Sequence, residues 1–211
     1  MIFPSRYPEY LIDSILIILA PGPSVLFAIA RAIAWGRATA VATVVGNALG
    51  MFFLSILIAF GLGPILERSE IAYLAVQVLG GLYLIYLGID ALRHSKVEAA
   101  EMVNQGEIRP THLKSIRDGF WVGALNPKGL VFFAAILPQF LDRDGSNLTV
   151  QLLLMGATFA ILAIIGDGTW GLLAGTARTW MASSPMRLIR LRRLGGSVIV
   201  ALGLLTLISA A

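Results

Sequence analysis

The chain has 211 residues, of which 57% are hydrophobic and only 13% charged, and its mean hydropathy is +0.83. Soluble domains carry about a quarter charged residues, so this composition excludes an ordinary soluble protein and indicates a membrane protein. The chain lacks cysteine, which excludes disulfides and thiolate metal sites. Its net charge of +4 fits basic residues held on the cytoplasmic side of a membrane better than a nucleic-acid partner.

The apolar segments, taken in chain order, predict an all-α polytopic fold with six membrane-spanning helices. The predicted spans are 10–34, 38–61, 71–92, 119–141, 148–177 and 194–211. The longest polar connector, 93–118, is expected to be a cytoplasmic loop, because it mixes both signs of charge and is not apolar enough for a domain core. The whole chain, 1–211, is therefore expected to form a single transmembrane domain.

The lysines and arginines predict how these spans are oriented. Most of them follow the first, third and fifth spans: Arg31, Arg37, Arg93, Lys96, Arg109, Lys114, Arg117, Arg178, Arg187, Arg190, Arg192 and Arg193. The opposite set of connectors holds only Arg6, Arg68 and Arg143. Because basic loops stay in the cytoplasm, both termini are predicted to lie outside, on the opposite side of the membrane from the cytoplasm.

A repeated pattern indicates two related halves. The sequence Leu-Gly-Gly, five residues, Leu-Gly occurs at 79–88 and again at 194–203. The first span is interrupted at Gly22-Pro23 and the fourth at Asn126-Pro127. Chance is the alternative for the repeat, and simple kinks are the alternative for the prolines.

Together these features predict two inverted three-helix repeats, about 10–92 and about 119–211, in which helices 1 and 4 are broken. Three spans are an odd number, so the two halves must have opposite orientations. Inverted repeats with broken helices at matching positions are the sequence signature of a secondary transporter.

The breaks also predict an anion-binding site near the membrane midplane. Pro23 and Pro127 can each be the first residue of a second half-helix, where the missing N–H costs nothing. Lys128 lies about nine residues into its span, too deep to reach the surface easily. A substrate carboxylate would satisfy both the lysine and the helix N-termini. In the alternative interpretation, Lys128 is structural and pairs with Asp167 or with carbonyls freed at the break.

Two further polar residues lie inside predicted spans. Asp167 is the only acid well inside the fifth span and is a candidate for amine binding or proton relay, or else a structural partner of Lys128 or a hydroxyl. Asn47 can contact a polar substrate or form an interhelical hydrogen bond. Gly46 and Gly50 form a Gly-x-x-x-Gly pair, which favours close helix packing and is also compatible with a homodimer.

No pattern in the sequence indicates an enzyme. We find no metal-ligand pair, no nucleophile with its base and no phosphate-binding glycine loop, so no catalytic residue, metal or cofactor is expected.

Four segments resemble the lysine exporter (LysE/RhtB) family of bacterial amino-acid exporters. They are Pro21-Gly22-Pro23, Gly36 followed by Gly46 and Gly50, LGGLYLIYLGIDALR at 79–93, and GALNPKGLVFFAAILPQFL at 123–141. The resemblance covers nearly the whole chain and implies an inner-membrane carrier that expels amino acids or their derivatives, driven by the proton gradient. The basic-amino-acid exporters of this family have an aspartate near the position of Asn47, so the neutral residue here favours a neutral substrate such as homoserine or threonine.

The sequence thus predicts a secondary-active amino-acid efflux carrier, with protons as the coupling ion and the lipid bilayer as its environment. The expected substrate-binding residues are Pro21, Gly22, Pro23, Ser24, Asn47, Asn126, Pro127, Lys128 and Asp167. The alternatives are a carrier for a cation or another small solute, and a membrane scaffold subunit that transports nothing.

Overall fold

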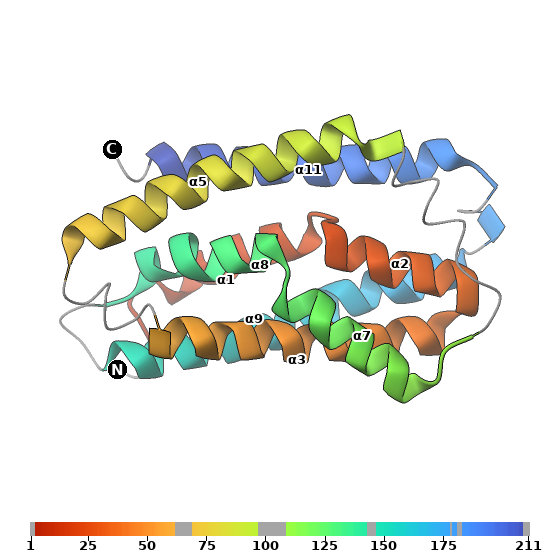
Figure 1. Ribbon diagram of the computed structural model, residues 1–211, viewed down its shortest axis with the longest axis horizontal. Helices are drawn as coiled ribbons and strands as arrows, with labels where there is room; N and C mark the ends of the chain where they lie inside the picture. The colour runs from red at the N-terminus through yellow and green to blue at the C-terminus, as the bar shows by residue number, and fades with distance from the viewer. Residues whose placement is uncertain are drawn as a thin grey trace.

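The structure is a computed structural model and describes residues 3–61, 69–96, 109–142, 147–177, 179–180 and 183–208. Within these residues it is all helical (Figure 1). The elements, in chain order, are α1 (Tyr7–Leu19), α2 (Pro23–Trp35), α3 (Arg37–Gly61), α5 (Glu70–Arg93), α7 (His112–Ala124), α8 (Pro127–Val131), η1 (Phe132–Ile136), η2 (Leu137–Phe140), α9 (Leu148–Thr176) and α11 (Pro185–Ile208).

Four of the described helices, α3, α5, α9 and α11, are each long and apolar enough to cross a membrane. Two pairs of helices, each bent at a short break, are also long and apolar enough when each pair is counted as one span. They raise the number of candidate spans among the described residues to six. Large hydrophobic side chains are exposed on the outer faces of these helices, for example Phe60, Ile71 and Ile165. Helices that are apolar on their outer face as well as their inner face are typical of a membrane environment.

Local sequence explains where the helices begin. The side chains of Ser69, Thr111 and Asn147 accept hydrogen bonds from first-turn N–H groups of α5, α7 and α9. Between α2 and α3 the chain turns at Gly36, whose φ of 88° lies in the left-handed region that favours glycine. Short turns of this kind keep consecutive helices adjacent.

Two predicted boundaries are wrong. The last helix begins at Pro185 instead of 194, and the helix before the second break begins at His112 instead of 119. In both cases charged residues lower the hydropathy of the first turns, so the apolar span was predicted to begin later. Arginine and lysine are nevertheless good helix formers, and the helix includes them. The predicted 93–118 loop therefore ends earlier, before the helix that begins at His112. Residues 97–108 of this loop lie outside the described part of the chain.

The second half of the fourth span is not a plain α-helix. One turn of α8 is followed by the π-helix η1 and the 3₁₀-helix η2. Pro138 has no N–H to donate to the carbonyl of Ala134. The side chain of Gln139 donates to the next carbonyl, that of Ala135, at 2.7 Å. The proline thus explains why the regular pattern ends here.

Glycines bring two pairs of helices into close contact. On α3 and α7, a Cβ atom at Gly46 would lie 2.0 Å from the carbonyl oxygen of Ile116, and one at Gly119 would lie 2.1 Å from that of Thr43. A Cβ atom at Gly50 would lie 2.1 Å from the carbonyl oxygen of Phe120, and one at Gly123 would lie 2.2 Å from that of Asn47. The Gly46 and Gly50 pair therefore packs against α7 of the same chain, as the close-packing interpretation predicted.

The glycines of the repeated pattern pack α5 against α11, which lie side by side along one edge of the bundle (Figure 1). A Cβ atom at Gly88 would lie 2.7 Å from the carbonyl oxygen of Gly196, and one at Gly196 would lie 2.8 Å from that of Gly88. Gly81 and Gly203 face each other in the same reciprocal way, since a Cβ atom on either would lie within 3.1 Å of the other's carbonyl oxygen. The two copies of the pattern are thus in contact with each other.

Candidate functional site

Both helix breaks occur where the sequence predicted them. The pair α1 and α2 is bent by 47°, with Gly22 as the N-cap of α2, and the pair formed by α7 and the segment Pro127–Phe140 is bent by 45°. Asn126 caps α8 by accepting a hydrogen bond from the backbone N–H of Lys128 at 3.0 Å. Its amide nitrogen donates to the hydroxyl of Ser24 at 3.0 Å, so the two breaks lie against each other.

Lys128 is buried at the junction of the breaks and caps the end of α1. Its ammonium donates to the carbonyl oxygens of Ile17, at 2.8 Å, and Ala20, at 3.0 Å. In a continuous helix the Ile17 carbonyl would accept from residue 21, but Pro21 has no N–H to give. The negative end of the α1 dipole also attracts the ammonium. These are the contacts of the structural alternative, in which carbonyls freed at the break hold the lysine.

Each residue of Pro21-Gly22-Pro23 has a definable role in this arrangement. Pro21 leaves the Ile17 carbonyl free, and Pro23 is the first residue of α2, where a proline is well tolerated. A Cβ atom at Gly22 would lie 3.0 Å from the Nζ atom of Lys128, so the glycine leaves room for the lysine.

Asp167 and Asn47 form a second buried polar pair. The amide nitrogen of Asn47 donates to one carboxylate oxygen of Asp167 at 3.0 Å. The Oδ1 atoms of both residues are buried and have no hydrogen-bond partner within the described part of the chain. Buried acceptors without donors are costly in the membrane interior, so this pair is equipped to accept hydrogen bonds from a bound group.

The pair lies close to the break in helix 1. Gly166, next to Asp167, packs against Ile18, where a Cβ atom would lie 2.5 Å from the Cγ2 atom of the isoleucine. Lys128 and Asp167 are close enough for their opposite charges to interact, although Lys128 makes no ion pair within 4.0 Å with any residue that the structure describes. The predicted residues are therefore gathered in one region, as a junction group and an acceptor pair.

This polar region is closed off from both ends of the bundle. Ser24, Asn47, Asn126, Lys128 and Asp167 are each at most 4% exposed. At the end where α1 begins, the hydroxyl of Tyr10 donates to the carbonyl of Met155 at 2.6 Å, and the hydroxyls of Tyr7 and Thr158 are 2.8 Å apart.

An ion pair closes the opposite end. Arg31 of α2 contacts Asp118 of α7 at 2.8 Å, and the guanidinium also lies over the rings of Phe27 and Trp35, at 4.5 and 5.3 Å from their centroids. The sequence analysis placed Arg31 among the connector residues, but it is 7% exposed inside the bundle. The signal that could have identified it is the spacing Phe-x-x-x-Arg-x-x-x-Trp, which puts all three side chains on one helix face.

A second buried arginine was also assigned to a connector. Arg192 lies inside α11, is 4% exposed, and its charge acts on Lys128. No group of three or more His, Cys, Asp or Glu side chains is close enough to hold a metal ion within the described residues.

Comparison with known proteins identifies the family of the chain. The profile of the LysE type translocator family matches residues 15–210, a range that contains both breaks and the residues Ser24, Asn47, Asn126, Lys128 and Asp167. The chain belongs to this family. No solved structure gives a significant match.

Three relatives align along nearly their whole length. An uncharacterized membrane protein of Vibrio cholerae is 27% identical over 196 residues, which cover 93% of each chain. The homoserine/homoserine lactone efflux proteins of Salmonella typhimurium and Salmonella typhi are 29% and 30% identical, with the same coverage. The chain is thus a membrane translocator by family, related to proteins of small-molecule efflux.

Proposed function

We propose that this protein exports a neutral, zwitterionic amino acid or a close derivative across the bacterial inner membrane. The observation that carries the proposal is the opposite polarity of the two buried groups. An ammonium has three N–H donors, and Lys128 gives two of them to Ile17 and Ala20. Asp167 and Asn47 together have two buried acceptors without donors among the described residues.

The substrate carboxylate would bind between Lys128 and the start of α2. The N-cap of α2 is Gly22, which has no side chain to occupy the first N–H groups, so the backbone N–H groups of Ser24 and Val25 can receive an anion. At α8 this role is already filled, since the Asn126 side chain takes the N–H of Lys128. The substrate ammonium would bind the Oδ1 atoms of Asp167 and Asn47.

The neutral character of Asn47 supports a neutral substrate side chain. A second carboxylate at that position would favour a basic amino acid. Two relatives with 29% and 30% identity are named for homoserine and homoserine lactone efflux, which fits the same choice.

Alternating access would arise from two inverted repeats that move against each other about the site. Supporting features are the two bends of similar angle, at the first span of each half, and the reciprocal glycine contacts between α5 and α11. The closed ends described above would represent an occluded state.

Proton coupling would proceed through Asp167, whose protonation would weaken its hold on the substrate ammonium. The end of the bundle with Arg37, Arg93, Lys114, Arg117, Arg187 and Arg190 would face the cytoplasm, with both termini in the periplasm. The protein would then be a carrier and not an enzyme.

The test is efflux from cells loaded with dipeptides of different amino acids, with the intact protein compared with Lys128→Ala and Asp167→Asn at equal membrane abundance. We expect the intact protein to export a subset of neutral amino acids and both variants to lose export. Exposed Lys114→Ala should export normally. Normal export by either site variant would remove that residue from the mechanism.

The efflux experiment, together with the thermal stability of the purified protein, separates the alternatives. A carrier for cations would export no amino acid, and the purified protein would be stabilised by a metal ion and not by amino acids. A scaffold subunit would show no efflux from any loaded cell and would tolerate both substitutions.

A further inference from the structure

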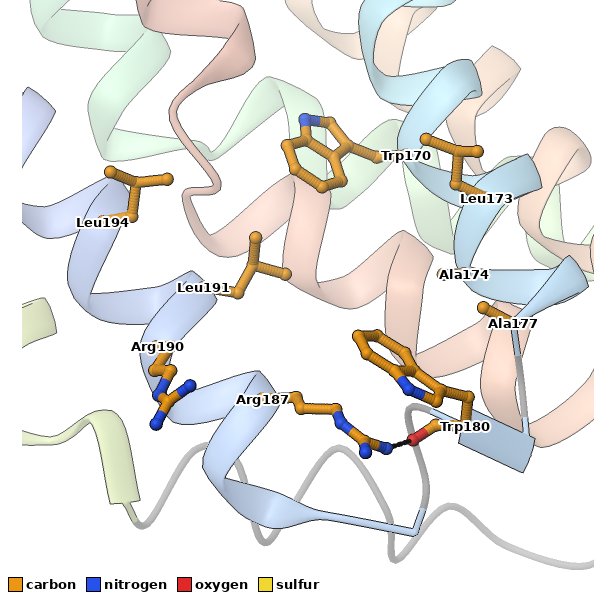
Figure 2. Close-up of a pocket in the computed structure, with 9 residues that line it drawn as sticks. All are labelled: Trp170, Leu173, Ala174, Ala177, Trp180, Arg187, Arg190, Leu191 and Leu194. Carbon is orange, nitrogen blue, oxygen red and sulfur yellow. Dashed lines mark hydrogen bonds between the residues drawn. The ribbon is translucent and has the colours of Figure 1, made fainter.

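A cavity of about 360 Å³ lies between the end of α9 and the start of α11 (Figure 2). Its lining residues are Trp170, Leu173, Ala174, Ala177, Trp180, Arg187, Arg190, Leu191 and Leu194. Figure 2 shows the Trp170 ring between Leu194 of α11 and Leu173 of α9. Apart from the two arginines, the lining is apolar or aromatic.

The cavity opens toward the surroundings of the bundle. Leu173 and Trp180 are each 58% exposed and Leu194 is 60% exposed, whereas Lys128 and Asp167 are 3% and 4% exposed. In a chain that crosses a membrane, exposed leucines of this kind face lipid. A ligand would therefore enter this cavity from the bilayer.

The positive charge at the cavity is concentrated, and none of the described residues that line it is an acid. Arg187 and Arg190 lie in the first two turns of α11, and the first turn of that helix contains no Asp or Glu. The positive end of the helix dipole repels both arginines, so an anion placed between them would be stabilised by the arginines and by the dipole together.

The arginine closer to α9 is held in place. The guanidinium of Arg187 lies 4.0 Å from the centroid of the Trp180 ring and donates to the hydroxyl of Ser183 at 3.0 Å and to the Trp180 carbonyl. Arg190 makes no hydrogen bond or ion pair within the described residues. One arginine is thus oriented beside a cavity and the second is available for a ligand.

We propose that this cavity binds one anionic phospholipid, with the phosphate between Arg187 and Arg190 and an acyl chain along Leu173, Leu191 and Leu194. The charge is complementary to a phosphate, and the lining is complementary to an acyl chain. Basic pockets between helices at a membrane boundary recognise anionic headgroups in this way. The inference rests on the chain spanning a membrane and does not depend on which solute it carries.

The test is native mass spectrometry of the full chain in mixed phosphatidylglycerol and phosphatidylcholine, without added amino acid. We expect the intact protein to retain one phosphatidylglycerol in preference to phosphatidylcholine. The double variant Arg187→Gln with Arg190→Gln should lower that preference by about 30-fold, since each arginine near the surface contributes about fivefold.

Two further variants make the result specific. Ala177→Trp keeps both arginines and fills the cavity, so it should also lose the retained lipid. The control Arg93→Gln with Lys114→Gln removes the same charge from the same end of the bundle and should leave retention unchanged.

Equal retention of the two lipids by the intact protein, or an equal effect of the control and the arginine pair, would overturn the proposal. If Ala177→Trp lowered amino-acid efflux while lipid retention stayed intact, the cavity would be a substrate entrance, and the lipid assignment would be wrong.

Discussion

The ammonium of Lys128 lies 3.0 Å from the carbonyl oxygen of Ala20, so a side chain at the start of α8 caps the end of α1. The contact joins a side chain of one broken span to the unpaired backbone carbonyls of the other. It also places a positive charge where two helices are interrupted inside the bundle.

Removing the ammonium should destabilise the fold. In Lys128→Met the side chain keeps much of its volume, but the carbonyls of Ile17 and Ala20 lose their donor. Each unsatisfied buried acceptor costs about 1–3 kcal/mol of folding free energy. We therefore expect Lys128→Met to unfold at a clearly lower temperature in detergent, with unfolding monitored by tryptophan fluorescence. Exposed Lys114→Met should unfold like the intact chain. Equal unfolding temperatures for both variants would contradict the capping role.

A side chain at position 22 should displace Lys128. The added Cβ atom of Gly22→Ala would lie 3.0, 3.1 and 3.2 Å from the Nζ, Cε and Cδ atoms of the lysine. The lysine is flexible enough to move, so we expect a folded protein with reduced efflux. Gly168→Ala is the control, because a Cβ atom there meets nothing within 4 Å. Unchanged efflux in Gly22→Ala would show that the lysine tolerates displacement.

The contact between α3 and α7 should not tolerate even one methyl group. In Gly46→Ala the new Cβ atom would lie 2.0 Å from the backbone oxygen of Ile116, and a backbone atom cannot rotate away. Overpacking of this kind costs about 1–3 kcal/mol or more. We expect a large drop in the yield of monodisperse protein by size-exclusion chromatography. Gly61→Ala, which meets nothing within 4 Å, should give the normal yield.

Weakening the Arg31 and Asp118 ion pair should open the polar region from the basic end. The chain has no cysteine, so Ser24→Cys provides a single reporter in the buried junction. With Asp118→Asn added, we expect a water-soluble thiol reagent to react severalfold faster than in Ser24→Cys alone. Adding Lys114→Met instead should leave the rate unchanged. A rate insensitive to Asp118→Asn would show that other contacts keep this end closed.

The opposite end should respond to acid. The hydroxyl and the backbone N–H of Ser5 both donate to Asp142 at 2.7 Å and hold the pKa of this carboxyl below its usual value of 3.8. Because the folded-state pKa is below the unfolded one, this contact stabilises above the unfolded value and is lost as the pH falls through the folded value.

Below a pH near 3.8, we therefore expect the amides around Ser5 in the intact chain to lose protection against hydrogen exchange, measured as the observed rate relative to the intrinsic rate at the same pH. In Asp142→Asn, this protection should be less dependent on pH across the same window. Identical pH profiles would show that Asp142 does not secure this segment.

Sequence reasoning located the breaks and most helices because prolines, glycines and apolar length act locally. Pro23 and Pro127 begin helices in the structure, as their position after Gly22 and Asn126 predicted. The starts at Pro185 and His112 were missed, since hydropathy does not register helices that continue beyond the apolar part of a span.

The composition of the buried site was also predictable, but its pairing was not. Deep position alone identified Lys128 and Asp167, and left open whether they contact each other, the freed carbonyls or a substrate. The answer depends on how the two breaks meet, which is a tertiary contact with no local signal. Arg31 was missed for a related reason, because its partner Asp118 lies on a helix far away in the chain.

The fit of Lys128 beside Gly22 has a consequence for how this protein can change over generations. A side chain at position 22 would crowd the lysine, and the room that the glycine leaves is occupied by the lysine. Neither residue can be replaced alone without loss. These two positions are expected to covary among descendants of a common ancestor, and lineages that give up one should be found to have given up the other.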